Sequence, residues 1–466
     1  MKERIQRLKR DYPKKTAWYW LLITLLLFPL LPEYLSLILL LISFVVFKVY
    51  WSKINKKALL GETGKIFLIY MCYMIISAFW SKTHLLSALI GLLWMGCFLI
   101  YVYVANTVNT KRKLKNAITL INLSAGIIGF IAILEVVTYN MSQHLDGFSF
   151  AFPNPLYYYV NDIIYDAIPV DIVNYKFEAR ASSTFDNPLI LATYLVTVTP
   201  FCAFGSVYFS HSKNRKISRV CFLLALGGII CTSSRGAYIA VGLSLLAILL
   251  STSNKHLFRR IFPFIVLLAI AIPVGLVLRY KNYPKGDFLA STSKRFDIWE
   301  SCFDIFLKNP VVGLGAGSDN VHTLLRDTYG IDRTHAHNLF LELLVEGGVI
   351  GGIFVVIILI MIASLLLRLL KTTDKIFHRY SALYASSLVG FVTMSLFEHT
   401  LQSPKELIVF FMVLGFIEAT YRIATNRQQI TQEEILNYTE YESISDLQPR
   451  FVRTKIERKS RNIQPF

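Results

Sequence analysis

The sequence predicts an all-α polytopic membrane protein with about twelve transmembrane helices. Of its 466 residues, 54% are hydrophobic and only 17% are charged, which excludes an ordinary soluble globular protein. Apolar stretches long enough to cross about 30 Å of hydrocarbon as a helix recur along the chain. Together, composition and spacing indicate a bundle of membrane-spanning helices.

Each expected span is an apolar run that ends near charged or turn-forming residues. The runs are 17–32, 34–50, 65–80, 85–106, 116–138, 188–210, 217–232, 235–251, 260–279, 339–369, 381–399 and 404–424. The run from 339 exceeds the length of one straight span, so we expect it to tilt or to project past the bilayer. No small-residue cleavage site follows the basic N-terminal stretch, so the first span is expected to remain as an anchor.

Basic residues are concentrated in every second connection between the expected spans. By the positive-inside rule these connections are cytoplasmic, and both termini lie on the same side. The net charge of +18 is therefore largely a topology signal, and no nucleic-acid partner is expected. The six cysteines show no paired spacing, so neither a disulfide framework nor a metal cluster is indicated.

This topology divides the chain into six parts. They are helices 1–5 in residues 1–138, a first external loop at 139–187, helices 6–9 in 188–279, a second external loop at 280–338, helices 10–12 in 339–424, and a polar cytoplasmic tail at 425–466 that is flexible or bound to the surface. Loops as long as these two external ones are usually functional when they are ordered.

Short amphipathic helices are expected in the two external loops. In the second loop Phe296, Trp299, Phe303 and Phe306 recur at three- and four-residue steps. This spacing predicts an apolar stripe on one helix face, which packs on the bundle or lies at the membrane surface, with packing favoured.

Arginines on the external side break the charge pattern. Arg180, Arg235 and Arg295 fall near the external membrane surface, and Arg235 lies in a link of only a few residues. Desolvating a guanidinium costs several kcal/mol unless an anion or a carboxylate partners it, and its flat fork of donors suits phosphate. Each arginine alone is explained by a nearby carboxylate or by lipid headgroups. Together with His337, the three indicate a bound anion.

The stretch RTHAHNLFLELLVEGG carries further ionisable groups at the external end of the tenth span. His335 and His337 precede the apolar run, and Asn338 is placed to cap the helix. Glu342 and Glu346 follow at four-residue spacing on one side of that helix, where carboxylates face protein or a water-filled cavity rather than lipid. The positive end of this helix would face the same cavity as the arginines.

These motifs resemble the O-antigen ligase and polymerase superfamily. The resemblance rests on RFDIWESCFDIFLKNPVVGLGAGSDN, on THAHNLFLELLVEGGVIGG, on TSSRGA and on RASSTFDNPLILATYL, which lie between residues 180 and 355. It implies a GT-C-like fold and a metal-independent glycosyltransferase without a cofactor, in the bacterial cytoplasmic (inner) membrane. The implied donor is a polyprenyl (undecaprenyl)-diphosphate-linked oligosaccharide, used at the external or periplasmic face.

The resemblance also implies roles for single residues. Arg180, Arg235 and Arg295 match arginines that line the donor pocket, and His337 matches the essential histidine. Glu342 matches a carboxylate of the same motif, as an orienting or packing partner, whereas His335 is equally well explained as a loop histidine. On this basis we expect His337 to remove the proton of the attacking hydroxyl, with inversion at the anomeric carbon. The competing hypothesis is that His337 binds the diphosphate.

Three functions are compatible with the sequence. The first is a polysaccharide polymerase, and the second is an O-antigen ligase or protein O-glycosyltransferase that uses the same donor with a different glycan or lipid-glycan acceptor. The third is a transporter or flippase of the lipid-linked glycan, which is disfavoured because the charges gather at one membrane face and not at the midplane. The lack of a large soluble acceptor-binding domain favours the polymerase, whose partners would include membrane lipid, a flippase and a chain-length regulator.

Overall fold

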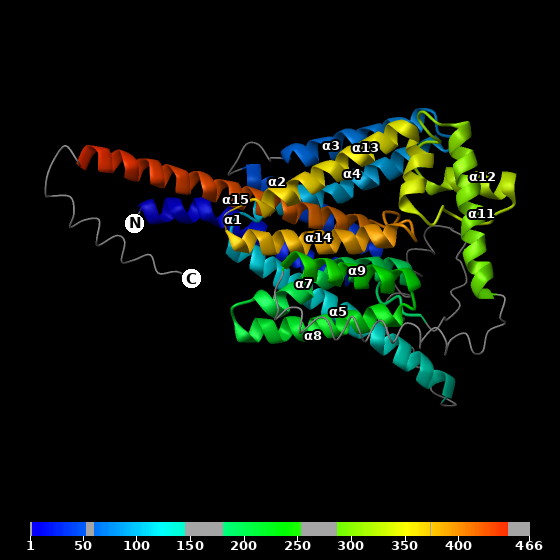
Figure 1. The fold of residues 1–466 in the computed structure, drawn as a ribbon, viewed down its shortest axis with the longest axis horizontal. Coiled ribbons are helices and arrows are strands. Elements are labelled where there is room, and N and C mark those ends of the chain that lie inside the picture. The colour runs from blue at the N-terminus through cyan, green and yellow to red at the C-terminus, as the bar shows by residue number, and fades with distance from the viewer. Residues whose placement is uncertain (1, 53–59, 145–179, 253–286, 373, 446–466) are drawn as a thin grey trace.

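The computed structural model describes residues 2–52, 60–144, 180–252, 287–372 and 374–445. Throughout this part of the chain every regular element is a helix (Figure 1). The all-α prediction is therefore confirmed. The expected ninth span, 260–279, and most of the first external loop lie outside the described residues.

The helices follow the expected spans closely. Their bounds are α1 Lys2–Leu27, α2 Glu33–Ser52, α3 Gly61–Ile76, the 3-10 helix η1 Ser77–Phe79, α4 His84–Thr107, α5 Lys111–His144, α7 Pro188–Tyr208, α8 Ser212–Cys231, α9 Arg235–Thr252, α11 Asp287–Lys308, α12 Ser318–Tyr329, α13 Leu339–Leu370, α14 Lys375–Ser395 and α15 Pro404–Ser445. Within the described ranges, seven helices are long and apolar enough to cross a membrane, and α1 and α9 contain shorter apolar segments. The polytopic class is thus confirmed, and the count of twelve remains a prediction.

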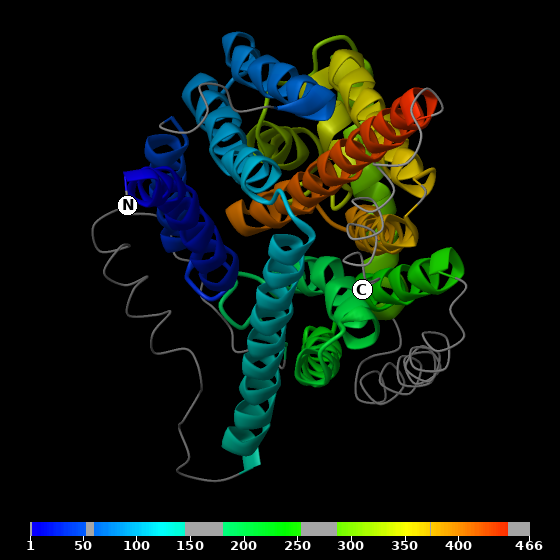
Figure 2. The same cartoon turned by 90° about the vertical axis from the view of Figure 1, so that its left-hand side faces the viewer.

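The spanning helices form one bundle, and two helices of the second external loop lie across its end. Figure 1 shows α11 and α12 at the end opposite to the beginning of α1 and the distal part of α15. Seen along the bundle, α15 passes through the middle, in contact with α4, α7 and α14 (Figure 2). Most side chains of α7 and of the first half of α15 are buried, whereas α13 is largely exposed on the bundle surface.

α13 is broken at Gly348, whose backbone dihedrals are φ 60° and ψ −163°. The loop after α11 fits into the break: the N–H of Val349 donates to the carbonyl of Pro310 (2.8 Å), and the N–H of Gly315 donates to the carbonyl of Glu346 (2.9 Å). These bonds satisfy backbone groups that an interrupted helix would leave unpaired. The long apolar run therefore contains a break near its beginning, and its tilt or projection past the bilayer stays a prediction.

The amphipathic helix predicted in the second loop is present as α11, and only one side of its aromatic stripe is packed. Trp299 and Phe306 pack against a small core shared with α12 and α13. Phe296 and Phe303 are 61% and 50% exposed. Trp299 and Phe306 therefore form the packed side of the predicted stripe, and Phe296 and Phe303 lie about 60° around the helix on its exposed side.

The C-terminal boundary also differs from the expectation. α15 continues without interruption through Ser445, so the beginning of the polar tail predicted from residue 425 is helical. The described part of the tail extends away from the end that carries α11 and α12 (Figure 1).

Candidate active site

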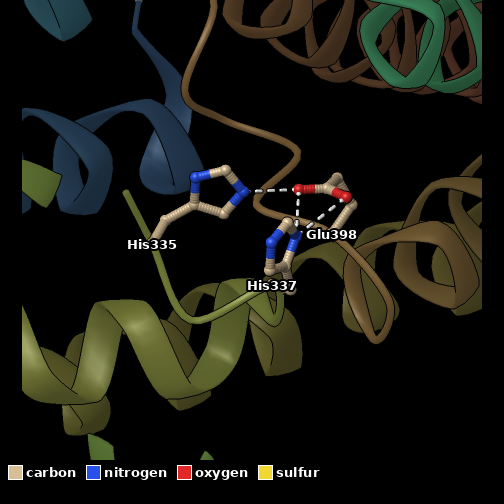
Figure 3. Close-up of side chains that lie close together, drawn as sticks. All are labelled: His335, His337 and Glu398. Atoms are coloured by element: carbon tan, nitrogen blue, oxygen red, sulfur yellow. Dashed lines mark hydrogen bonds and ion pairs between the residues drawn. The ribbon is translucent and has the colours of Figure 1, made fainter. Parts of the chain in front are cut away.

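His335 and His337 both contact one carboxylate, that of Glu398 (Figure 3). The Nε2 of His335 lies 2.6 Å from Glu398 Oε1, and the Nδ1 of His337 lies 3.0 Å from Oε1 and 3.2 Å from Oε2. The side chain of Glu398 is only 7% exposed, whereas those of His335 and His337 are 12% and 19% exposed. We call these three residues the histidine cluster.

The charge of Glu398 decides where the histidine protons lie. Burial raises the pKa of its carboxyl, but the hydrogen bonds from His335 and His337 and their charges outweigh this and hold the pKa well below its usual range. An ionised carboxylate only accepts hydrogen bonds, so both ring nitrogens that face it carry protons. In its neutral form His337 then has its lone pair on Nε2.

Local backbone structure presents His337 in an unusual conformation. Its φ is +50°, the left-handed region that non-glycine residues seldom adopt and that is frequent at functional sites. Directly after it, Asn338 caps α13, since its side-chain oxygen accepts hydrogen bonds from the N–H groups of Phe340 (3.0 Å) and Leu341 (3.1 Å). The cap fixes the beginning of α13 next to the strained residue.

Ala336, between the two histidines, is held from both sides. Its N–H donates to Glu342 Oε2 (2.6 Å), and its carbonyl accepts from the indole N–H of Trp299 (3.0 Å). Both Ala336 and Glu342 are fully buried. The structure therefore places Glu342 behind the loop, one step removed from the histidine rings.

The three predicted arginines come from separate elements, and one of them interacts with the histidine cluster. Arg295, on α11, interacts electrostatically with Glu398 and with Arg235, the first residue of α9: burial lowers its pKa, Glu398 raises it and Arg235 lowers it. Arg180 reaches the turn before α9, where its Nε donates to the carbonyl of Thr232 (3.0 Å). Three arginines that are far apart in sequence are thus brought to the end of the bundle that carries the histidines.

An apolar cavity of about 360 Å³ lies between the helices of the bundle. Its lining includes Leu339 and Phe340, which follow His337 and its cap, and Leu401, which lies in the turn that carries Glu398. From there it extends between α3, α4, α13, α14 and α15 as far as Leu366. Residues that neighbour the histidine cluster in the sequence therefore line part of the cavity, although His335, His337 and Glu398 themselves do not.

Sequence reasoning missed Glu398 and its neighbour His399. Both are buried, and burial together with the charge of His335 lowers the pKa of His399 to about 3. The signal was the pair Glu-His in FEHT, at the external end of the expected span 381–399. Ionisable residues at such a position are functional candidates by default, as the external arginines were.

Metal binding has one candidate location in the described ranges. One ligand atom each from His335, His337 and Glu398 lie within 4.8 Å of one another. The 2.6 Å separation of His335 Nε2 and Glu398 Oε1 is that of a charge-assisted hydrogen bond with a proton between the atoms. The arrangement as it stands therefore fits hydrogen bonding better than ligation.

Fold and site together define a class: a helical polytopic membrane protein that gathers arginines and histidines at one end of its bundle. Residues 220–356 match the family model described as O-antigen ligase, a segment that contains Arg235, Arg295 and His337. This match supports the resemblance to the O-antigen ligase and polymerase superfamily.

A curated relative is similar over part of the chain. It is the ComP-specific O-oligosaccharyltransferase of Acinetobacter baylyi, 25% identical over 254 residues. The matched region is 52% of this chain and 44% of the relative, so the chain spans less than half the length of that protein in the alignment.

Proposed function

We propose that this protein is a membrane glycosyltransferase that moves a glycan from a polyprenyl-diphosphate donor to a hydroxyl acceptor. The observation that carries the proposal is the meeting of the histidine cluster with Arg235 and Arg295 at one end of the bundle. The match to the O-antigen ligase family model and the similarity to an O-oligosaccharyltransferase support the same reaction type.

The arginines would hold the diphosphate. When the bond between the anomeric carbon and the diphosphate oxygen breaks, the leaving group takes the electron pair and gains negative charge. Arg180, Arg235 and Arg295 supply fixed positive charge there, and donors arranged in advance stabilise such a transition state most effectively where water is excluded. The partial burial of Arg295 is consistent with this arrangement.

His337 would accept the proton. As the acceptor oxygen bonds to the anomeric carbon, the hydroxyl proton moves to Nε2 of His337, because Nδ1 already donates to Glu398. His335 is less suited, since Glu398 and the hydroxyl of Thr334 (2.8 Å) occupy both of its ring nitrogens. Attack opposite to the leaving group gives inversion at the anomeric carbon.

The apolar cavity supports a lipid-linked donor. A diphosphate held by the arginines leaves its polyprenyl chain to be covered by apolar surface, and the cavity beginning at Leu339 and Leu401 provides it. The site lies at the end of the bundle opposite to the start of α1 (Figure 1). With the basic N-terminus in the cytoplasm, this supports a site at the external face of the bacterial cytoplasmic membrane.

The acceptor distinguishes two candidates. We retain a polysaccharide polymerase, in which the acceptor is another lipid-linked glycan and in which a flippase and a chain-length regulator would act beside it. The named relative favours the second candidate, a ligase or protein O-glycosyltransferase. In a deletion strain, a polymerase defect leaves single repeat units on the final carrier, whereas a ligase defect leaves long chains on the lipid.

The test is to delete the gene, restore it and analyse both lipid-linked and transferred glycans by mass spectrometry. Lipid-linked glycan should accumulate in the deletion and disappear on restoration. An unchanged glycan profile would contradict the proposal. EDTA should leave the purified protein active, and a loss restored by a divalent ion would instead make His335, His337 and Glu398 metal ligands.

A further inference from the structure

We propose that Glu398 is a positioning residue that fixes the ring orientation and tautomer of His337, so that Nε2 is the proton acceptor. This inference rests on the proposed function. Glu398 lies beyond the segment that matches the family model, 220–356, and it reaches His337 from the turn between α14 and α15.

The geometry gives Glu398 control of the ring. An imidazole can rotate by half a turn, which exchanges the places of its two nitrogens, and either one can carry the proton. Both oxygens of Glu398 lie within 3.2 Å of Nδ1 of His337. A buried acceptor-only group at this position favours a ring that donates from Nδ1 and keeps its lone pair on Nε2.

The same carboxylate distinguishes the two histidines. It accepts from Nε2 of His335 but from Nδ1 of His337, so the two rings are held in opposite tautomers. His335 uses its remaining nitrogen as acceptor for the hydroxyl of Thr334. In the described part of the chain, every hydrogen bond found for the ring of His337 involves Nδ1.

The surroundings of Glu398 keep its carboxyl ionised and hold its orientation. Arg295 on α11 adds positive charge near it, and the backbone N–H of His399 donates to its Oε1 (3.4 Å). Glu342 on α13 also interacts electrostatically with Glu398, and its Oε2 accepts a hydrogen bond from the N–H of Ala336. Because His335 and His337 both donate to Glu398, the carboxylate remains the acceptor despite its burial.

Glu398→Gln tests the tautomer with almost no change in size. The amide offers one acceptor oxygen and one donor nitrogen, so it cannot accept from both histidines. Glu398→Asp keeps an acceptor-only carboxylate on a shorter stem. Glu406→Gln is the matched control, since Glu406 is a buried acid whose Oε2 accepts from the N–H of Ser403 and which does not bond to either histidine.

The direct readout is nitrogen-15 NMR of the full chain in lipid nanodiscs with labelled histidine. The His337 signals are assigned by their loss in His337→Ala. In the wild type and in Glu406→Gln, His337 should be protonated at Nδ1, and in Glu398→Gln it should shift to the other tautomer or to a mixture. An unchanged His337 tautomer in Glu398→Gln together with wild-type transfer would overturn the inference.

The functional readout is glycan transfer per folded molecule in the restored deletion strain. Glu398→Gln should reduce it by about 10- to 1000-fold, as loss of a group that orients a general base does, and Glu398→Asp should recover at least part of it. Affinity for inorganic diphosphate, used as the probe, should stay within about threefold. Equal losses in the Asp and Gln variants, with diphosphate affinity lost as well, would show a structural role and overturn the inference. Failure of the wild-type gene to restore transfer would instead contradict the proposed function.

Discussion

Two ionic clusters lie in and beside the same turn between α14 and α15, and they differ in one essential respect. The histidine cluster is partly exposed, and Nε2 of His337 remains available. The second, which we call the lysine cluster, contains Lys405, Glu33 and Asp186. Lys405 is fully buried, donates to the carbonyl of Thr184 and lies 4.1 Å from the centre of the Phe185 ring.

The lysine cluster joins three distant segments of the fold. Ser403 donates to Glu33 Oε1 at the beginning of α2 (2.6 Å), and Lys405 binds the segment that follows Arg180. Electrostatic interactions connect Lys405 with both Glu33 and Asp186. Lys405 and Glu33 are buried and bonded to other segments, which suits a structural role, whereas the available ring nitrogen of His337 suits a chemical one. A shifted pKa alone does not distinguish a structural cluster from a catalytic one.

The largest effect expected from this comparison is on activity. His337→Ala should reduce transferred glycan by about 100-fold or more, because general-base catalysis contributes about 10²- to 10⁴-fold. The amount of folded protein should not change, and lipid-linked glycan should accumulate in the restored deletion strain. His335→Ala should cost less. Wild-type transfer in His337→Ala would remove the distinction between the clusters.

The next largest effect on transfer is expected when an arginine loses its planar pair of hydrogen-bond donors. Arg235→Lys and Arg295→Lys keep the charge but not the planar donors, so each should lower transfer by about tenfold or more. The matched control is Arg326→Lys, on α12, where the arginine is exposed and pairs with Asp327. If all three variants are equally active, Arg235 and Arg295 serve topology or packing only.

Substitution in the lysine cluster should lower stability and leave transfer activity nearly unchanged. Lys405→Met removes the cation beside the buried Glu33 and the partly buried Asp186, and it should lower the free energy of unfolding by about 3–5 kcal/mol, measured by thermal unfolding in detergent. Transfer per folded molecule should stay within about threefold. A stable Lys405→Met protein with abolished transfer would assign Lys405 to the chemistry.

The smallest effect is a difference in pH dependence. The folded-state pKa of Glu398 is lowered, so its contribution to stability is present above its ordinary value of 4.5 and is lost as the pH falls below it. For Asp186, burial raises the pKa above 3.8, and Lys405 and Glu33 only partly offset this. The contribution of Asp186 to the stability of the folded state therefore declines as the pH rises above 3.8. Relative to the wild type, Glu398→Gln should therefore gain stability in acid, and Asp186→Asn should gain it toward neutral pH. Parallel melting curves across pH 3–7 would contradict these opposite signs.

Periodicity and charge predicted most of the fold, because membrane helices are long and their signals are local. The break at Gly348 was not predictable, since it depends on the loop around Pro310 and Gly315 fitting into α13. His337 could be proposed as a site residue from the sequence because its motif is contiguous. Glu398 was missed because it lies 61 residues further along the chain and meets His337 only in three dimensions.

The central claim is that His337 accepts a proton while the arginines hold the diphosphate. Its most direct test measures donor affinity and turnover separately for wild type and His337→Ala in lipid nanodiscs, with lipid-linked glycan extracted from the deletion strain as donor. We expect His337→Ala to bind this donor with an affinity within about threefold of wild type. Its turnover should be at least about 100-fold slower. Weak binding with normal turnover of the bound donor would contradict the claim and make His337 a diphosphate ligand.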